Sequence, residues 1–217
     1  MRRALTLCFV TLLGACGYNK TTIPNTVEAA HYDPEHMARV RIFSSPELQA
    51  FYQPGASCEQ VRYRKKDDAL IATKVYAGNE HHILGRQVDL KGMKAEDYQN
   101  RAIGIPASEA TNRLAHDRIG YDEFVLPAGK PSVVMINYWF RDPQNPSWCS
   151  PAPVVLEPKA GKDYEVEFSF VSTGFMSASC RLDVRELIGN APIRQGQEVK
   201  TNHCVRNEQY NYDTVAH

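Results

Sequence analysis

Residues 164–170 read Tyr-Glu-Val-Glu-Phe-Ser-Phe and are the clearest sign of this chain's architecture. Apolar and polar side chains alternate along the stretch, which is the period of a β-strand with one buried face. The pattern predicts that the aromatic rings and Val166 face a core, whereas Glu165 and Glu167 face solvent. Ala-Gly-Lys at 160–162 comes just before the strand and predicts a tight turn in which glycine adopts a positive φ.

Other stretches on both sides carry related signals. Residues 38–43 alternate apolar and charged side chains, and 133–140 form an apolar run long enough for a strand buried on both faces. Residues 79–122 have a weaker pattern and predict a long excursion over the surface of the body, with a short helix within 108–116. Further strands are expected at 48–52, 69–76, 123–126, 154–156 and 180–185.

Thirteen glycines and thirteen prolines interrupt the chain, and no helical period is sustained. Short strands separated by turns predict a mainly β protein with an antiparallel β-sandwich, immunoglobulin- or transthyretin-like, of about seven strands. A small open barrel is the alternative architecture.

The N-terminus carries a targeting signal. Arg2 and Arg3 precede an apolar run from 4 to 13, which is typical of a secretory signal peptide and too short to span a bilayer as a stable helix. Leu-Gly-Ala-Cys at 13–16 resembles the lipobox of bacterial lipoproteins. This resemblance implies cleavage after residue 15 and acylation of Cys16, palmitate included. An ordinary cleaved signal peptide is the alternative.

Composition divides the chain into four segments. The signal peptide (1–15) is followed by a polar, aperiodic stretch (16–36), expected to be a lipidated N-terminus and flexible tether. Residues 37–190 are expected to form the β-sandwich domain. Residues 191–217 are polar and predict a C-terminal tail that is poorly ordered beyond Cys204.

Four cysteines remain in the expected body, Cys58, Cys149, Cys180 and Cys204. An exported protein meets an oxidising compartment, so they predict two disulfides with three possible connectivities. We favour Cys58 with Cys149 and Cys180 with Cys204, because the second pair would staple the tail to a strand. Zinc is the alternative, and it lacks a Cys-x-x-Cys motif to support it.

The balance of charge argues against a nucleic-acid partner. Removing the signal peptide leaves 23 basic residues against 25 acidic ones, whereas nucleic-acid binding relies on a strongly basic face. One basic cluster, at 62–66, is followed at once by two aspartates.

No catalytic constellation is visible. His81 and His82 adjoin Glu80, but neighbouring histidines point in different directions, and His116-Asp117 has no nucleophile that the sequence can place. A loose group of ligand types, His31, Asp33, Glu35 and His36, falls in the expected tether. His-Glu-x-x-His, Gly-x-Ser-x-Gly and Walker motifs are absent from the sequence. We therefore expect no catalytic residue, no metal and no cofactor.

Several segments together carry a family resemblance. Ile-Gly-Ile-Pro at 103–106, the stretches 124–131 and 160–166, and the cysteines Cys149 and Cys180 resemble a group of uncharacterised proteobacterial outer-membrane lipoproteins with a small β-sandwich domain. The resemblance spans residues 38–188. It implies an envelope location and a fold, and it brings no catalytic residue. Within lipoproteins, Gly17 in place of an aspartate implies the outer membrane.

The expected function is that of a noncatalytic envelope lipoprotein. Cys16 would anchor it in the outer membrane, with the body on the periplasmic side rather than the surface. The body would serve as a structural or protein-interaction module for an unidentified envelope protein. One alternative is a periplasmic small-ligand or metal-binding module with a pocket lined by Tyr and His from 79–122. A second is an envelope hydrolase in which His116, Asp117 or other carboxylates converge with a nucleophile.

Overall fold

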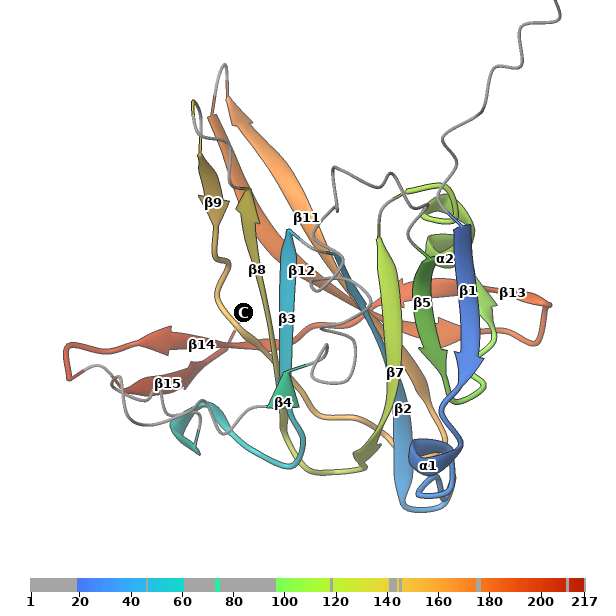
Figure 1. Cartoon of the computed structure of the whole chain (residues 1–217). Helices are drawn as coiled ribbons and strands as arrows, with labels where there is room; N and C mark the ends of the chain where they lie inside the picture. Colours follow the sequence, from blue (N-terminus) through green and yellow to red (C-terminus); the bar gives the residue numbers. More distant parts are fainter. Residues whose placement is uncertain are drawn as a thin grey trace, which may run out of the picture.

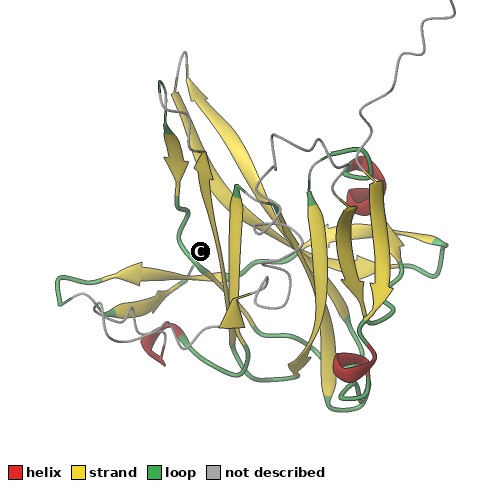
Figure 2. Ribbon diagram, in the orientation of Figure 1, coloured by secondary structure: helices red, strands yellow, loops and turns green. Residues whose placement is uncertain are grey.

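The computed structural model describes residues 19–45, 47–60, 73–74, 97–117, 119–140, 144, 146–174, 177–209 and 211–216. Within these ranges the chain is mainly β, as the sequence predicts, and its helices are short (Figures 1 and 2). None of the helices in the described ranges is long and apolar enough to cross a bilayer.

The helical elements are α1 (Thr26–Ala29), the 3-10 turn η1 (Cys58–Gln60) and α2 (Glu109–Arg113). The strands are β1 (Asn19–Pro24), β2 (Met37–Ser44), β3 (Leu48–Gln53), β4 (Thr73–Lys74), β5 (Asp97–Ala102), β6 (Ala107–Ser108), β7 (Gly120–Pro127), β8 (Ser132–Phe140), β9 (Ser147–Cys149), β10 (Val154–Leu156), β11 (Asp163–Gly174), β12 (Ser177–Ile188), β13 (Ile193–Glu198), β14 (Asn202–Arg206) and β15 (Tyr212–Val215).

The strands form two sheets. The first has the order β1-β5-β7-β2-β11-β12-β13-β6, and the second runs β15-β14-β10-β8-β3-β4 with β9 paired to β8. The expectation of antiparallel sheets is wrong for the first sheet, because β1·β5, β5·β7, β2·β11 and β6·β13 are parallel. Side chains alternate with the same period in both kinds of sheet, so the pattern predicts strands without their direction.

The facing sides of the two sheets share one apolar core. It includes Val40 and Ile42 of β2, Ile136 of β8, and Tyr164 and Val166 of β11, all buried. The apolar face predicted for residues 164–170 therefore does turn inward along its first half. Removing this surface from water is the main stabilising contribution to such a two-layer body.

The first sheet curls on itself. β5 is the second strand from one edge and β6 is the opposite edge, yet four residues join them in the chain. Four residues span at most about 18 Å from end to end, so the two margins of the sheet must approach each other. The segment from β5 to α2 consequently covers the face of β2 and β11 that points away from the second sheet. The short helix predicted within 108–116 is present as α2, whereas β5 and β6 are strands of the first sheet that the predicted surface excursion did not include.

Both terminal segments contain strands, in contrast to the expected tether and tail. β1 pairs in parallel with β5 over its whole length, and α1 follows with its N-cap at Asn25. The Glu28 carboxylate of α1 accepts a 2.8 Å hydrogen bond from the backbone N–H of Val125. At the other end, β13 to β15 continue the sheets as far as Val215. Polar composition misled the prediction because these strands lie toward sheet edges and need few apolar side chains.

The disulfides join Cys58 to Cys204 and Cys149 to Cys180. Two disulfides among these cysteines were predicted, but the favoured pairing was wrong. η1 brings Cys58 against β14, whereas β9 and β12 place Cys149 and Cys180 opposite each other across the two sheets. The bonds close segments of 146 and 31 residues. In the chain-entropy model these loops correspond to about 5 and about 4 kcal/mol of stabilisation.

The two Ala-Gly-Lys turns meet at the base of the body. Gly129 and Gly161 have φ values of 68° and 71°, as their turn positions predict. The N–H of Gly129 donates to the carbonyl of Pro158, and that of Gly161 donates to the carbonyl of Met37. The turns thereby tie the ends of β7, β2 and β11 together.

Candidate functional site

Cys16, the predicted lipidation site, lies outside the described residues, as do His81 and His82. The loose ligand group near the N-terminus is described and exposed. There the His36 ring nitrogen lies 2.7 Å from an Asp33 carboxylate oxygen, and this hydrogen bond lowers the pKa of Asp33. In the described part of the chain, no three His, Cys, Asp or Glu side chains gather as a metal site would require.

His116 and Asp117 are both exposed in the turn that follows α2. None of the hydrogen bonds or ion pairs found for the described residues joins either side chain to a serine, threonine or cysteine. The geometry therefore gives no support to the hydrolase alternative at this position.

A buried layer of charge, which the sequence analysis missed, fills the curled face of the first sheet. The Arg41 guanidinium donates to Glu123 Oε1 from Nε (2.9 Å) and Nη2 (2.7 Å), and to Glu165 Oε1 from Nη1 (2.6 Å). Its Nη2 also donates to the carbonyls of Ile105 and Pro106 at 2.8 and 3.0 Å. Arg41, Glu123 and Glu165 are each no more than 1% exposed.

The surrounding backbone completes this layer. Glu123 Oε2 accepts hydrogen bonds from three consecutive backbone N–H groups, those of residues 103–105, at 2.7 to 3.1 Å. The Ser108 hydroxyl, which is also the N-cap of α2, donates to Glu165 Oε1 at 2.5 Å. The Ile-Gly-Ile-Pro segment thus wraps its main chain around a carboxylate and a guanidinium.

Ion pairs extend the layer along the same face. Arg39 binds Asp163 through two nitrogens at 2.7 and 2.9 Å, and Arg194 binds the same carboxylate at 2.9 Å. The Glu167 carboxylate forms ion pairs with Arg113 Nη2 at 2.7 Å and with Arg185 Nη1 at 2.9 Å.

The predicted solvent exposure of Glu165 and Glu167 is therefore wrong, since the two residues are only 1% and 7% exposed. The register explains the burial: β2 lies parallel to β11 with Arg39 opposite Asp163 and Arg41 opposite Glu165. Arginines and carboxylates at the same two-residue spacing in two strands were the sequence signal for this pairing. Every carboxylate of the layer is matched by arginine, so we assign the layer a structural role.

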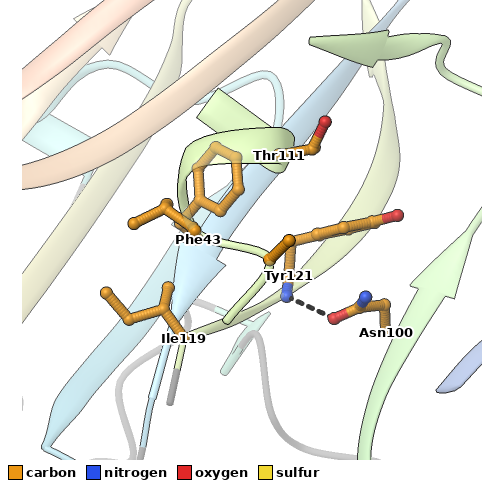
Figure 3. Close-up of a pocket in the computed structure, with 7 residues that line it drawn as sticks. Phe43, Asn100, Thr111, Ile119 and Tyr121 are labelled. Atoms are coloured by element: carbon orange, nitrogen blue, oxygen red, sulfur yellow. Dashed lines mark hydrogen bonds between the residues drawn. The ribbon is translucent and has the colours of Figure 1, made fainter. Parts of the chain in front are cut away.

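A small hollow lies beside this layer (Figure 3). Its volume is about 180 Å³, and its lining residues are Phe43, Asn100, Thr111, Leu114, Ala115, Ile119 and Tyr121. The Asn100 side-chain oxygen accepts a 3.0 Å hydrogen bond from the N–H of Tyr121, which the close-up marks. Ligand pockets commonly measure roughly 300–1,000 Å³. The hollow is smaller, and Tyr121 is the one Tyr or His among its lining residues.

Four large aromatic side chains are exposed where β8, β9 and β11 project beyond the core. We call Trp139, Phe140, Trp148 and Phe170 the aromatic tip, and they are 49%, 41%, 67% and 57% exposed. Trp139 is thus only about half buried, although the run 133–140 was expected to form a strand buried on both faces. β8 and β11 are buried along their first halves and become exposed toward these ends.

The tip is held in a defined shape. Trp139 and Trp148 are cross-strand partners whose rings stack at a centroid distance of 6.2 Å. Between the sheets, the ring of Tyr138 contacts that of Phe170 edge to face at 4.9 Å. The Cys149–Cys180 disulfide joins β9 to β12 at the same level, because Cys149 pairs with Tyr138 and Cys180 pairs with Phe170.

The strand segments that carry the tip contain no Lys, Arg, Asp or Glu. This holds for residues 137–140 and 147–149 at the ends of β8 and β9, and for 168–174 and 177–180 at the ends of β11 and β12. The acidic residues of β11, Asp163, Glu165 and Glu167, lie nearer its start and on the face opposite to that of Phe170. Charged residues border these segments, because residues 141 and 142 are Arg and Asp in the sequence and Arg181 is the cross-strand partner of Ser169. Exposed aromatic rings grouped at uncharged strand ends are typical of a binding surface.

Comparisons with known proteins provide no identification: no family model, no curated protein and no solved structure matches the chain.

Proposed function

We propose that this protein is a noncatalytic lipoprotein of the bacterial envelope, anchored through acyl chains on Cys16, and that it acts by binding through the aromatic tip. The observation that carries the proposal is the tip itself: four exposed rings on strand ends without charge, stiffened by a disulfide. We assign the two sheets to a β-sandwich that serves as the rigid support of this surface.

The location rests on two independent features. Residues 1–16 have the charged start, apolar run and lipobox of a lipoprotein precursor. Two disulfides are typical of a protein that folds in an oxidising compartment. Gly17 after the acylated cysteine favours the outer membrane, with the body on the periplasmic side.

An anchored chain would hold this body close to its membrane. β1 begins at Asn19, three residues after Cys16. Three residues span at most about 10 Å, so the start of β1 would lie near the lipid headgroups. Because β1 begins at Asn19, the body would lie closer to the membrane than a flexible tether over residues 16–36 would allow.

The anchor is tested by intact mass spectrometry and fractionation of Cys16→Ala. The wild-type protein from membranes is expected to have the mass of residues 16–217 plus acyl chains, with no thiol alkylated before reduction. Cys16→Ala is expected to leave the membrane fraction. Cys8→Ala, within the signal peptide, is the matched control and is expected to remain membrane-bound. An unacylated wild-type mass, or membrane retention of Cys16→Ala, would refute the anchor.

A further inference from the structure

We infer that the surface bound by the aromatic tip is the lipid interface of the membrane that carries the anchor. This inference rests on the proposed function, because it takes Cys16 to be acylated. It adds the occupant of the tip and an orientation for the body. Trp139, Phe140, Trp148 and Phe170 would lie among the headgroups and the upper acyl chains.

The first argument is the direction of the strands. In Figure 1 the start of β1, the ends of β8 and β11, and the starts of β9 and β12 all point toward the upper end of the molecule. An acyl anchor within about 10 Å of the start of β1 would turn that end toward the bilayer. The tip would then face the lipid without any rearrangement of the fold.

The second argument is the chemistry of the tip. Trp rings are favoured at membrane interfaces, where an apolar body and a polar N–H are both accommodated. Phe140, on the other face of β8 from Trp139, and Phe170 add exposed apolar area at the same strand ends as the stacked pair Trp139 and Trp148. The strand ends 137–140, 147–149, 168–174 and 177–180 have no acidic or basic side chain, and charges border them at 141, 142 and 181. Contact limited to the strand ends would therefore desolvate no formal charge.

The third argument is that one acyl-bearing residue and a preformed apolar surface reinforce each other. Once the anchor is inserted, the effective concentration of lipid at a nearby surface is high. A weakly binding patch is then sufficient to fix the orientation of the body. The Cys149–Cys180 disulfide keeps the patch ordered beforehand, which lowers the entropic cost of contact.

The test uses the two tryptophans as reporters, since Trp139 and Trp148 are the only ones in the chain. The acylated protein is reconstituted in vesicles of phosphatidylethanolamine and phosphatidylglycerol, with and without brominated acyl chains. We expect a blue shift of Trp emission relative to a detergent-free Cys16→Ser chain. Quenching is expected to be stronger with bromine near the headgroup than near the chain end.

Two variants serve as controls for the quenching measurement. Phe140→Ser with Phe170→Ser leaves both reporters in place and is expected to lose most of the quenching. Val205→Ser removes a residue of comparable exposure (46%) in β14, below the end that carries the tip (Figure 1), and is expected to leave quenching unchanged. Far-UV circular dichroism of each variant checks that it is folded, and the wild-type depth profile tests the inference without any variant.

Five outcomes are decisive. Shallow quenching that depends on the phenylalanines supports the inference. If the protein has its acylated mass but shows no quenching, the inference about the lipid interface is overturned and the anchor remains supported. If the mass is unacylated, the proposed function is refuted instead. A blue shift in native membranes but not in pure lipid vesicles assigns the tip to a protein partner. A shift that grows with protein concentration without lipid assigns it to a second copy, and either result overturns the lipid interface.

Discussion

Replacement of Arg41 by methionine tests whether the buried charge layer acts as a unit. The substitution keeps much of the side-chain length but removes three hydrogen bonds to Glu123 and Glu165 and two to the carbonyls of Ile105 and Pro106. Two carboxylates would then remain buried without their cation.

The magnitude follows from this geometry. Breaking a buried ion pair by removal of one partner costs about 3–5 kcal/mol, and each buried carbonyl left without a donor adds about 1 kcal/mol or more. We therefore expect Arg41→Met to lower the free energy of unfolding by at least about 4 kcal/mol. Domains of this kind are stable by about 5–15 kcal/mol, so the variant would lie near the limit of folding.

The assay is urea unfolding at pH 7, followed by far-UV circular dichroism. Arg181→Met is the matched control, because Arg181 pairs with Asp183 at 2.7 Å while its side chain is 60% exposed. An exposed pair contributes at most about 1 kcal/mol. Arg41→Lys, which keeps the charge without the planar fork, is expected to cost less than Arg41→Met and provides a measurement if the latter does not fold.

A double variant separates loss of charge from loss of packing. Adding Glu165→Gln to Arg41→Met removes one of the two stranded carboxylates and is expected to recover at least about 1 kcal/mol. The reasoning fails if Arg41→Met costs no more than Arg181→Met. It also fails if the double variant is as unstable as the sum of its single changes.

The remaining predictions concern the two Ala-Gly-Lys turns and a surface carboxylate. Gly129→Ala is expected to cost about 1 kcal/mol of stability, because φ at Gly129 is 68° and a Cβ there would meet no other atom. Gly161→Ala is expected to cost about 2 kcal/mol, since a Cβ there would also lie 3.2 Å from a backbone carbonyl oxygen. Equal urea midpoints for the two variants would contradict this order. Hydrogen bonds from Ser57 and from Thr214 lower the pKa of Glu59 to about 2. The contribution of Glu59 to stability is therefore complete above the unfolded pKa of about 4.3 and is lost as the pH falls through about 2. In thermal unfolding, Glu59→Gln is expected to be less stable than the wild type at pH 6 and to approach it at pH 2. A difference that is constant with pH would contradict the assignment.

The position of the candidate surface was only partly predictable. The strand at 133–140 was predicted from its apolar run, but a run of this kind does not say where the facing sheet ends. Trp139 and Phe140 extend past the core because β8 continues beyond its buried first half. Exposure at a strand end depends on the lengths of neighbouring strands, which local patterning does not encode.

The sequence alone determined the mainly β class, most central strands, the two Ala-Gly-Lys turns and the expectation of two disulfides. These features depend on local side-chain period, on glycine geometry and on the count of cysteines. Tertiary structure decided what depends on partners distant in the chain: the parallel pairing of β2 with β11, the burial of Arg41 between Glu123 and Glu165, and the cysteine connectivity. A charged residue every second position favours a strand equally well whether its charge meets water or an opposite charge, and only the neighbouring strand distinguishes the two.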